Sequence, residues 1–224
     1  MDESTKTKKL WGTLEQSILS GRGIDIGCGA DPVFPHVKCF DLADGDANQI
    51  SKYVHEQFDF VYASHCLEHM HAPRQTVLDW WKLVAEGGHL FFIVPDEDLY
   101  EQGVFPSRFN PDHKATFTIS KQRSWSPVSI NVLDLARSLP GGELVSLVLQ
   151  DTGYDRRLLK HGPKASRAWA NFAERKYRGL RRRTGIQIKP LERFIWRFAV
   201  VDQTLRPDAS AQIQCIVKKR SAQP

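Results

Sequence analysis

Short apolar runs alternate with amphipathic stretches along the first 150 residues of the chain. Apolar spacings of three and four residues predict helices over residues 7–19 and 74–85. Strands are predicted for residues 23–27, 37–41, 58–63, 89–94 and 144–149. Strands that alternate with helices in this way favour a mostly parallel sheet with helices on both of its faces.

The later part of the chain breaks this regular alternation. About sixty residues separate the strand at 144–149 from a last strand predicted at 211–217, which is too long for a bare loop. A helix is predicted within this interval, over residues 164–183, with Ala165, Trp169, Phe172 and Ala173 on its apolar stripe. We therefore expect a single domain over residues 1–224, with a core at 20–150 and 198–218 and a helical insertion at about 151–197.

The segment 151–197 is also strongly basic. It carries 14 Lys and Arg against 4 Asp and Glu, whereas residues 1–150 carry 13 against 20. This asymmetry is typical of a surface that faces an anion, such as a phosphate backbone, a nucleotide-sugar, an anionic glycan or a lipid headgroup, or of a solvated basic helix. A smaller anionic molecule is preferred over nucleic acid, because no aromatic-rich nucleic-acid module accompanies the charges.

The cysteines and the apolar runs bear on the compartment. Cys28, Cys39, Cys66 and Cys215 lie far apart and form no CxxC pair, so we expect reduced thiols in the cytoplasm, with neither a disulfide nor a structural zinc site. The longest uninterrupted apolar run, Leu90 to Val94, is far too short to cross a bilayer. The N-terminus leads into no hydrophobic segment, so no signal peptide is expected.

A glycine turn follows the first predicted strand. Gly27 and Gly29 remove side chains where the backbone turns and approaches a ligand, at the strand end where open α/β sheets bind their ligands. Pro32 stands where a dinucleotide-binding turn has its third glycine, and Asp25 would repel a pyrophosphate but attract an ammonium group. A nicotinamide-dependent dehydrogenase is therefore disfavoured.

Residues 25–32 resemble motif I of class I S-adenosylmethionine-dependent methyltransferases. Residues 58–69 resemble the "FDxVxxxxxLEH" segment of the type 11 branch, and residues 86–90 resemble the entry to its fifth strand. The resemblance covers residues 20–96 in order. It implies a three-layer Rossmann-like fold with a mostly parallel sheet, an antiparallel last strand and the basic insertion before that strand. It also implies S-adenosyl-L-methionine as the cofactor.

The resemblance further implies which residues hold this cofactor. Asp25 is expected at the amino group of its methionine end, and Asp41, which matches the second-strand acid of the family, at the ribose hydroxyls. Asp46 and Ala47 resemble the pair that contacts adenine. The complete set of expected cofactor-binding residues is Asp25, Gly27, Cys28, Gly29, Asp41, Leu42, Asp46, Ala47, Ser64 and His65.

Two histidines are candidates for the catalytic base. Residues 110–118 resemble a "DHxxxFT" segment of bacterial type 11 enzymes that act on sugars or secondary metabolites, which makes His113 the first candidate. His65 is the second, because its position usually flanks the cofactor, whereas Glu68 and His69 are expected to orient the following helix. The spacing of His65, His69 and His71 would suit a metal ion, but no further ligand motif reinforces it, and no metal is expected.

The leading hypothesis is methyl transfer to an oxygen or nitrogen of a small molecule or sugar-containing metabolite, with a small-molecule or glycan acceptor that could be anionic. The alternative is an RNA-binding or RNA-modifying protein that keeps this fold and uses the basic segment 151–197. Ser64-His65-Cys66-Leu67 stands where enzymes that methylate the amines of nucleic-acid bases carry Asn/Asp-Pro-Pro-Tyr/Phe. The sequence leaves the natural acceptor and the oligomeric state open.

Overall fold

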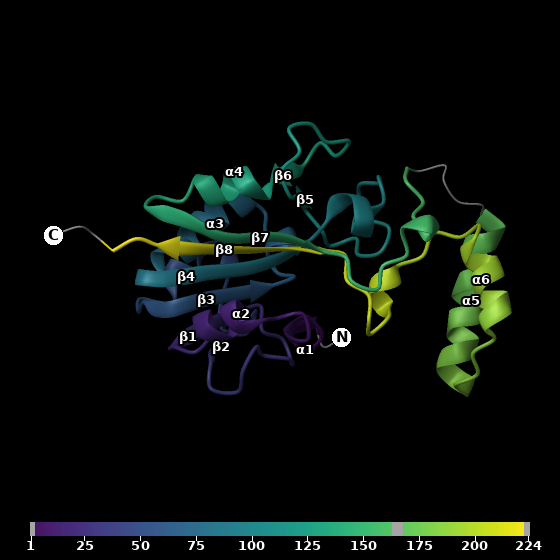
Figure 1. Ribbon diagram of the computed structural model, residues 1–224, viewed down its shortest axis with the longest axis horizontal. Coiled ribbons are helices and arrows are strands. Elements are labelled where there is room, and N and C mark those ends of the chain that lie inside the picture. The colour runs from purple at the N-terminus through teal and green to yellow at the C-terminus, as the bar shows by residue number, and fades with distance from the viewer. Residues whose placement is uncertain (1–2, 163–167, 222–224) are drawn as a thin grey trace.

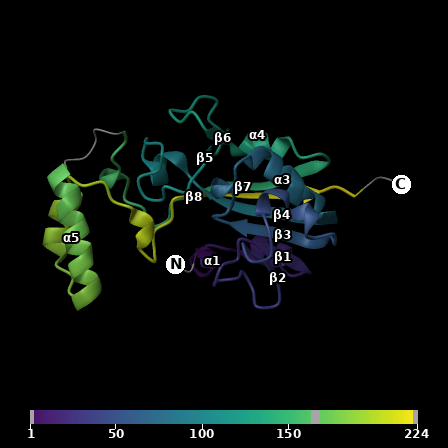
Figure 2. The same ribbon diagram turned by 180° about the vertical axis from the view of Figure 1, so that it is seen from behind.

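The computed structural model describes residues 3–162 and 168–221, which form a three-layer α/β fold around a six-stranded sheet (Figures 1 and 2). The strand order is β2-β1-β3-β4-β8-β7. The strands are β1 (Gly23–Ile26), β2 (Lys38–Phe40), β3 (Phe58–Ser64), β4 (Val84–Pro95), β7 (Gly142–Gln150) and β8 (Gln212–Lys219). A separate pair, β5 (Thr116–Thr118) and β6 (Ser129–Asn131), lies beside the end of β4.

The direction of the strands confirms the predicted fold class. β1 pairs in parallel with both β2 and β3, and β3 pairs in parallel with β4. The last strand, β8, runs antiparallel to both of its neighbours, β4 and β7. Because the chain order reverses between β1 and β3, their carboxyl ends flank the crevice where such sheets bind ligands.

Helices cover both faces of the sheet (Figure 1). The helices are α1 (Glu3–Lys8), α2 (Thr13–Ile18), α3 (Pro73–Lys82), α4 (Val132–Arg137), α5 (Ala168–Thr184) and α6 (Lys189–Trp196). Successive side chains of a strand point to opposite faces of the sheet, so the apolar side chains of β4 are divided between two cores. Leu90 and Phe92 pack in the core under α3 and α4, whereas Phe91 and Ile93 pack in the core that includes Ile18 of α2.

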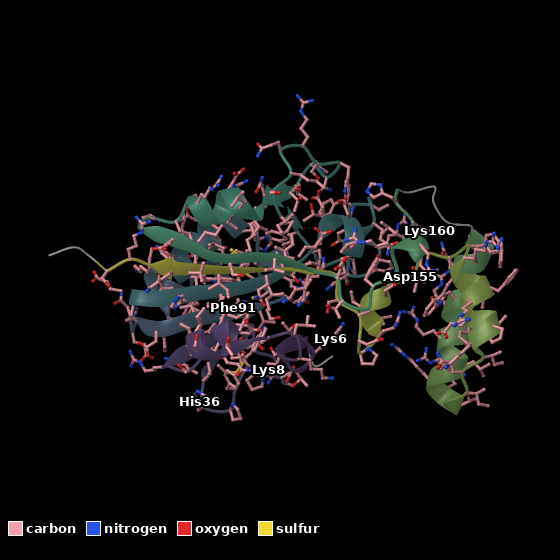
Figure 3. All side chains as sticks on the ribbon, in the orientation of Figure 1. Lys6, Lys8, His36, Phe91, Asp155 and Lys160 are labelled. Atoms are coloured by element: carbon pink, nitrogen blue, oxygen red, sulfur yellow. A yellow bond between two sulfur atoms is a disulfide. The ribbon has the colours of Figure 1, made fainter. Side chains whose placement is uncertain are left out.

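Three predicted helices differ from the structure in their bounds. The helix expected over residues 74–85 ends at Lys82, since β4 already begins at Val84. The helix expected over residues 7–19 is divided into α1 and α2, because Gly12 has an extended backbone and its N–H donates to the Glu15 side chain. Nζ of Lys8 donates to the carbonyl of Val33, in the loop that also carries His36. Figure 3 labels Lys8 and His36 on this side of the molecule. The helix expected over residues 164–183 appears as α5, and residues 164–167 lie outside the described residues.

Helices α5 and α6 form a hairpin between β7 and β8 that stands apart from the sheet in both views (Figures 1 and 2). The hairpin has a small core of its own, which includes Ala170, Tyr177 and Ile195. It lies beyond the carboxyl ends of the parallel strands. The division of the chain into one core and one insertion stays a prediction.

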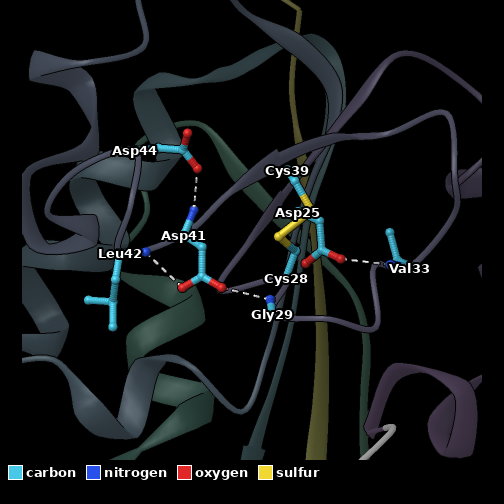
Figure 4. Close-up of a disulfide and its surroundings, with 8 residues drawn as sticks. All are labelled: Asp25, Cys28, Gly29, Val33, Cys39, Asp41, Leu42 and Asp44. Carbon is cyan, nitrogen blue, oxygen red and sulfur yellow. Dashed lines mark hydrogen bonds between the residues drawn. A yellow bond between two sulfur atoms is a disulfide. The ribbon is translucent and has the colours of Figure 1, made fainter.

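The expectation of four reduced cysteines is wrong for one pair. Cys28 and Cys39 form a disulfide, with their Cα atoms 5.7 Å apart (Figure 4). β1 and β2 are parallel neighbours, so Cys28, just beyond the end of β1, comes close to Cys39 within β2. The remaining two cysteines are free and buried. In the described part of the chain, no helix is long and apolar enough to cross a membrane. The cytoplasmic location stays a prediction.

Candidate active site

The glycine turn after β1 has the geometry that its sequence predicts. Gly27 and Gly29 both have positive φ angles, of 75° and 52°, which favour glycine. A Cβ atom on Gly27 would lie 2.8 Å from Sγ of Cys66, which is buried in the core. The turn therefore needs glycine at position 27 for its backbone conformation and for the close approach of the segment after β3.

Asp25 is buried beneath this turn. Its Oδ2 accepts a hydrogen bond of 2.7 Å from the backbone N–H of Val33 (Figure 4). Burial raises the pKa of Asp25 to about 7, with a smaller rise from the negative charge of Asp31, while the Val33 N–H and Lys8 act in the opposite direction. Asp25 therefore fixes the loop after the turn from below.

Asp41, at the end of β2, joins the two loops above the sheet. Its carboxylate accepts from the N–H of Gly29 at 2.8 Å and from its neighbour Leu42 at 2.7 Å (Figure 4). A carboxylate has about four lone-pair positions, so two remain for other donors. Asp44 in turn accepts from the N–H of Asp41 and fixes the backbone there.

A cavity of about 530 Å³ opens between these loops and the segment after β3. Six of the predicted cofactor residues line it: Gly27, Asp41, Leu42, Asp46, Ala47 and His65. Asp46 also caps the 3₁₀ helix η1 (Ala47–Lys52) by accepting from the N–H of Asn48, and this hydrogen bonding lowers the pKa of Asp46. Trp80 of α3 donates to the carbonyl of Ala47 and so fixes this wall to the core.

The other predicted cofactor residues lie elsewhere. Asp25, Cys28, Gly29 and Ser64 are not among the described residues that line the cavity. Sequence reasoning missed Met70, His71, Asp112 and Lys114, which do line it. Asp112 could have been predicted from its position next to His113. A loop that brings His113 to the site also brings Asp112 to the cavity wall.

His65 lies at the boundary between this cavity and a second one. It has a positive φ of 52°, an uncommon conformation that is often found at functional sites. Its Nε2 contacts Oε1 of Gln212 at 2.9 Å. The amide nitrogen of Gln212 donates to Thr7 and Gln150, so its oxygen accepts and Nε2 of His65 carries the hydrogen.

The second cavity, of about 360 Å³, lies beyond His65 and His69, which line both cavities. Its remaining described lining is mixed in character and comprises Lys6, Glu68, Tyr100, Phe109, Asn110, His113, Asp202, Thr204, Leu205, Ala211 and Gln212. The structure thus brings together both predicted catalytic histidines, His65 and His113, in the wall of one cavity.

His113 is held by its neighbours in one orientation. Its Nδ1 lies 2.6 Å from Oε1 of Glu101, at the end of the π-helical turn η3 (Glu97–Glu101), and Tyr100 stacks on its ring. The ring of His69 meets it edge-on. Nε2, on the other side of the ring, lies 4.0 Å from Oε1 of Glu68.

Glu68, in the short helix η2 (Leu67–His69), lies among three histidines. Its side chain is 1% exposed. Burial raises its pKa, but His65, His113 and His69 outweigh this effect and hold the pKa below its ordinary value. Glu68 is therefore a buried, charged carboxylate in the wall of the second cavity, and its expected role in orienting the next helix stays a prediction.

The chain belongs to the methyltransferase domain family, whose model matches residues 4–198. The prediction of a methyltransferase is thereby confirmed. No protein of curated function is similar to the chain in sequence.

Several solved structures are similar to the chain. The [4+2]-cyclase SpnF is 15% identical, with a TM-score of 0.50 and coverage of 98% of this chain and 81% of that one. A SAM-dependent methyltransferase from Archaeoglobus fulgidus is 14% identical, with a TM-score of 0.49 and coverage of 98% and 95%. A protein from Bacillus halodurans described as a methyltransferase is 13% identical, with a TM-score of 0.49 and coverage of 97% and 100%. At 15% identity the likeness to SpnF concerns the fold, which by itself does not set the substrate.

Proposed function

We propose that this methyltransferase transfers the methyl group of S-adenosylmethionine to an oxygen or nitrogen of a small molecule or a sugar-containing metabolite. The observation that carries the proposal is the pair of adjoining cavities that share His65 and His69. A lone pair of the acceptor attacks the methyl carbon, the new C–O or C–N bond forms as the S–C bond breaks, and S-adenosylhomocysteine leaves. Alignment of the two molecules across this boundary is the main contribution of the protein.

The larger cavity is the proposed cofactor site. The two remaining lone-pair positions of Asp41 suit the ribose hydroxyls. Leu42 is 92% exposed, so its side chain offers apolar surface for the adenine ring beside Asp46 and Ala47. Asp25 supports this site through the loop that it fixes at Val33.

The smaller cavity is the proposed acceptor site. Tyr100 and Phe109 give it aromatic surface, and Asn110 adds a side chain that both donates and accepts hydrogen bonds, a combination that suits a sugar. Lys6 would favour an acceptor with a negative charge. The proton of the acceptor passes to one of the two predicted histidines, His65 or His113, which both line this cavity.

Calorimetry with S-adenosylmethionine and S-adenosylhomocysteine tests the cofactor site. We expect micromolar binding that Asp41→Ala weakens at least tenfold. Glu143→Ala, which removes an exposed carboxylate on β7, is the matched control and should bind as the parent does. Equal binding by the parent and Asp41→Ala would remove Asp41 from the site, and no binding by the parent would refute the function.

Transfer of a labelled methyl group to an extract of small metabolites, followed by mass spectrometry, would identify the acceptor. The alternative of an RNA-binding or RNA-modifying protein predicts tight RNA binding that weakens steeply with salt, with the label absent from the small-metabolite fraction. A label that appears only in RNA would therefore overturn the proposed acceptor class.

A further inference from the structure

Glu68, His69 and His113 converge at the wall between the two cavities. One ligand atom from each residue, a carboxylate oxygen or a ring nitrogen, lies within 4.8 Å of the other two. Nε2 of His113 is 4.0 Å from Oε1 of Glu68. Glu68 and His113 are buried, whereas His69 is partly exposed towards both cavities.

The carboxylate of Glu68 faces histidines as charge partners, but no hydrogen bond satisfies its buried oxygens. Neither of its buried oxygens accepts a hydrogen bond. His65 and His113 approach Oε1 at 3.3 and 4.0 Å as charge partners, without the geometry of a hydrogen bond. An ionised carboxylate removed from water is strongly unfavourable unless a cation or several donors face it. A cation beside Glu68 would satisfy this requirement.

Both histidines of the group are oriented by carboxylates. Nδ1 of His113 lies 2.6 Å from Glu101, and Nδ1 of His69 lies 2.9 Å from Asp112. Histidines that bind metal ions commonly donate their other ring N–H to a carboxylate, which fixes the tautomer and makes the ligand nitrogen more basic. Each ring is thus left with one nitrogen for an ion.

We propose that Glu68, His69 and His113 bind a divalent transition-metal ion of the zinc type. Two imidazole nitrogens and one carboxylate oxygen form a donor set that such ions accept while keeping an open fourth position. With bonds of about 2.0–2.1 Å, tetrahedral ligand atoms lie roughly 3.3 Å apart. Ligand atoms that are now up to 4.8 Å apart would therefore approach one another by up to about 1.5 Å through side-chain rotation.

The position of the ion deepens the proposed function, on which this consequence rests. The open position would face the second cavity, so the preferred acceptor would carry a hydroxyl that binds the ion. His113 would then serve as a ligand. His65, which does not belong to the group of three, would be the predicted histidine left to receive the proton.

Metal binding can be measured without any activity. The chain, prepared without an affinity histidine tag, should bind one equivalent of Zn²⁺ by elemental analysis, and Co²⁺ should give the visible absorption of a tetrahedral site. Zn²⁺ should also raise the Tm of the unmodified chain. Glu68→Gln and His113→Asn should each weaken Zn²⁺ binding at least a hundredfold, whereas His36→Asn, at a histidine on the loop before β2, should leave it unchanged.

The results separate the two proposals. Absence of bound metal and of any Tm shift with Zn²⁺, Co²⁺ or Mn²⁺ would refute the metal site, even if the chain binds S-adenosylmethionine. Zn²⁺ binding that survives unchanged in both Glu68→Gln and His113→Asn would refute it as well. Metal binding by a chain that binds no S-adenosylmethionine would keep the metal site and refute the function.

The α5–α6 hairpin carries a second, independent inference. Trp169, Phe172 and Leu180 form an exposed stripe on α5 at helical spacings of three and eleven residues. Four further large apolar side chains of the hairpin are exposed: Ile186, Ile188, Leu191 and Phe194. Residues 168–197 also carry nine Lys and Arg but only two acidic residues. Both acids pair with arginines of α5, namely Arg178 and Arg181.

We infer that this hairpin docks on the surface of an anionic lipid bilayer. An apolar stripe of Trp, Phe and Leu beside Lys and Arg is the pattern of helices that lie in the membrane interface, where basic residues meet anionic headgroups. The aliphatic side chains distinguish this surface from an RNA-binding one, which uses aromatic stacking beside its positive charges. The hairpin lies beyond the carboxyl end of β3 (Figure 1), and His65, which directly follows that strand, lines the proposed acceptor cavity.

Vesicle sedimentation tests the docking. The full chain should bind vesicles of phosphatidylcholine with 30% phosphatidylserine at least tenfold more tightly than phosphatidylcholine alone, and Trp169→Ser with Phe172→Ser should abolish this binding. The matched control, Leu14→Ser with Val148→Ser, removes exposed apolar side chains of α2 and β7 and should bind as the parent does. Failure to bind the anionic vesicles would overturn the inference, and RNA binding or self-association through the hairpin would then identify the occupant. Vesicle binding that the Trp169→Ser, Phe172→Ser variant retains would overturn it as well.

Discussion

Asp25→Asn provides a quantitative test of the loop beneath the cofactor cavity. Asp25 is 1% exposed, and burial raises its pKa from an ordinary value of 3.8 to about 7. Its ionised form is therefore unfavourable in the folded protein. The protein bears no such cost below about pH 4, and the full cost applies above about pH 7. At about 1.4 kcal/mol per pKa unit, this cost reaches about 4 kcal/mol.

Asparagine keeps an oxygen that can accept from the N–H of Val33 but cannot ionise. The variant should therefore gain stability relative to the parent as pH rises from 4 to 8, by an amount on the order of 4 kcal/mol at most. Its amide NH₂ adds a buried donor that costs about 1–3 kcal/mol at every pH, so the difference between the two pH values is the decisive quantity.

Urea unfolding of the parent and the variant at pH 4, 6 and 8 measures this difference. Asp79→Asn is a control that should show no such rise over this pH range. The side chains of Ser51 and Lys82 lower the pKa of Asp79 against the effect of its burial, so its ionised form stabilises the fold at neutral pH, and the stabilisation is lost as pH falls below about 4. A free-energy difference between Asp25→Asn and the parent that stays constant from pH 4 to 8 would refute the reasoning.

Three further substitutions test the packing around the cofactor cavity. Gly27→Ala should lower the free energy of unfolding by about 2–4 kcal/mol and weaken S-adenosylmethionine binding at least tenfold, because the new methyl group would contact Cys66 and the backbone would keep a left-handed conformation. Urea unfolding measures the first effect and calorimetry the second. Unchanged affinity would contradict the role of the turn in binding. Cys39→Ser should cost up to about 3 kcal/mol in urea unfolding, and a reducing agent should abolish its difference from the parent. Trp80→Phe should lower the free energy of unfolding by about 1–3 kcal/mol and weaken cofactor binding several-fold, because the carbonyl of Ala47 loses its hydrogen-bond donor. Parental affinity in calorimetry would show that this wall of the cavity does not contact the cofactor.

Local signals in the sequence were sufficient to predict much of the fold. The alternating apolar residues of β4 and the glycines of the turn at Gly27 depend on neighbouring positions in the chain, so a single sequence reveals them. The disulfide between Cys28 and Cys39 depends on which strands are neighbours in the sheet, and no spacing rule reports that. For the same reason, no pattern in the sequence indicated that Glu101 would contact His113.

The site around Glu68 and His113 shows that a motif identifies candidate residues but not which other segment they contact. The "LEH" segment and the "DH" segment were each found in the sequence, but their contact arises because the N–H groups of Lys114 and Ala115 donate to the carbonyl of Glu68. This backbone pairing brings His113 and Glu68 together across 45 positions of the chain. The proposed metal ligands therefore come from two segments whose separate functions were predicted and whose joint function was not.

The position of Asp25 follows from strand geometry, which the motif alone did not consider. Successive side chains of a strand point to opposite faces of the sheet. Ile24 and Ile26 both belong to the core under α3 and α4, so Asp25 between them must point to the other face, where Val33 and Phe60 lie. Residues beyond the strand end, such as Gly27, are released from this alternation and can face the crevice. We therefore expect the turn to contact a ligand above the carboxyl ends of the strands, and Asp25 to act on that ligand only through the loop that it holds.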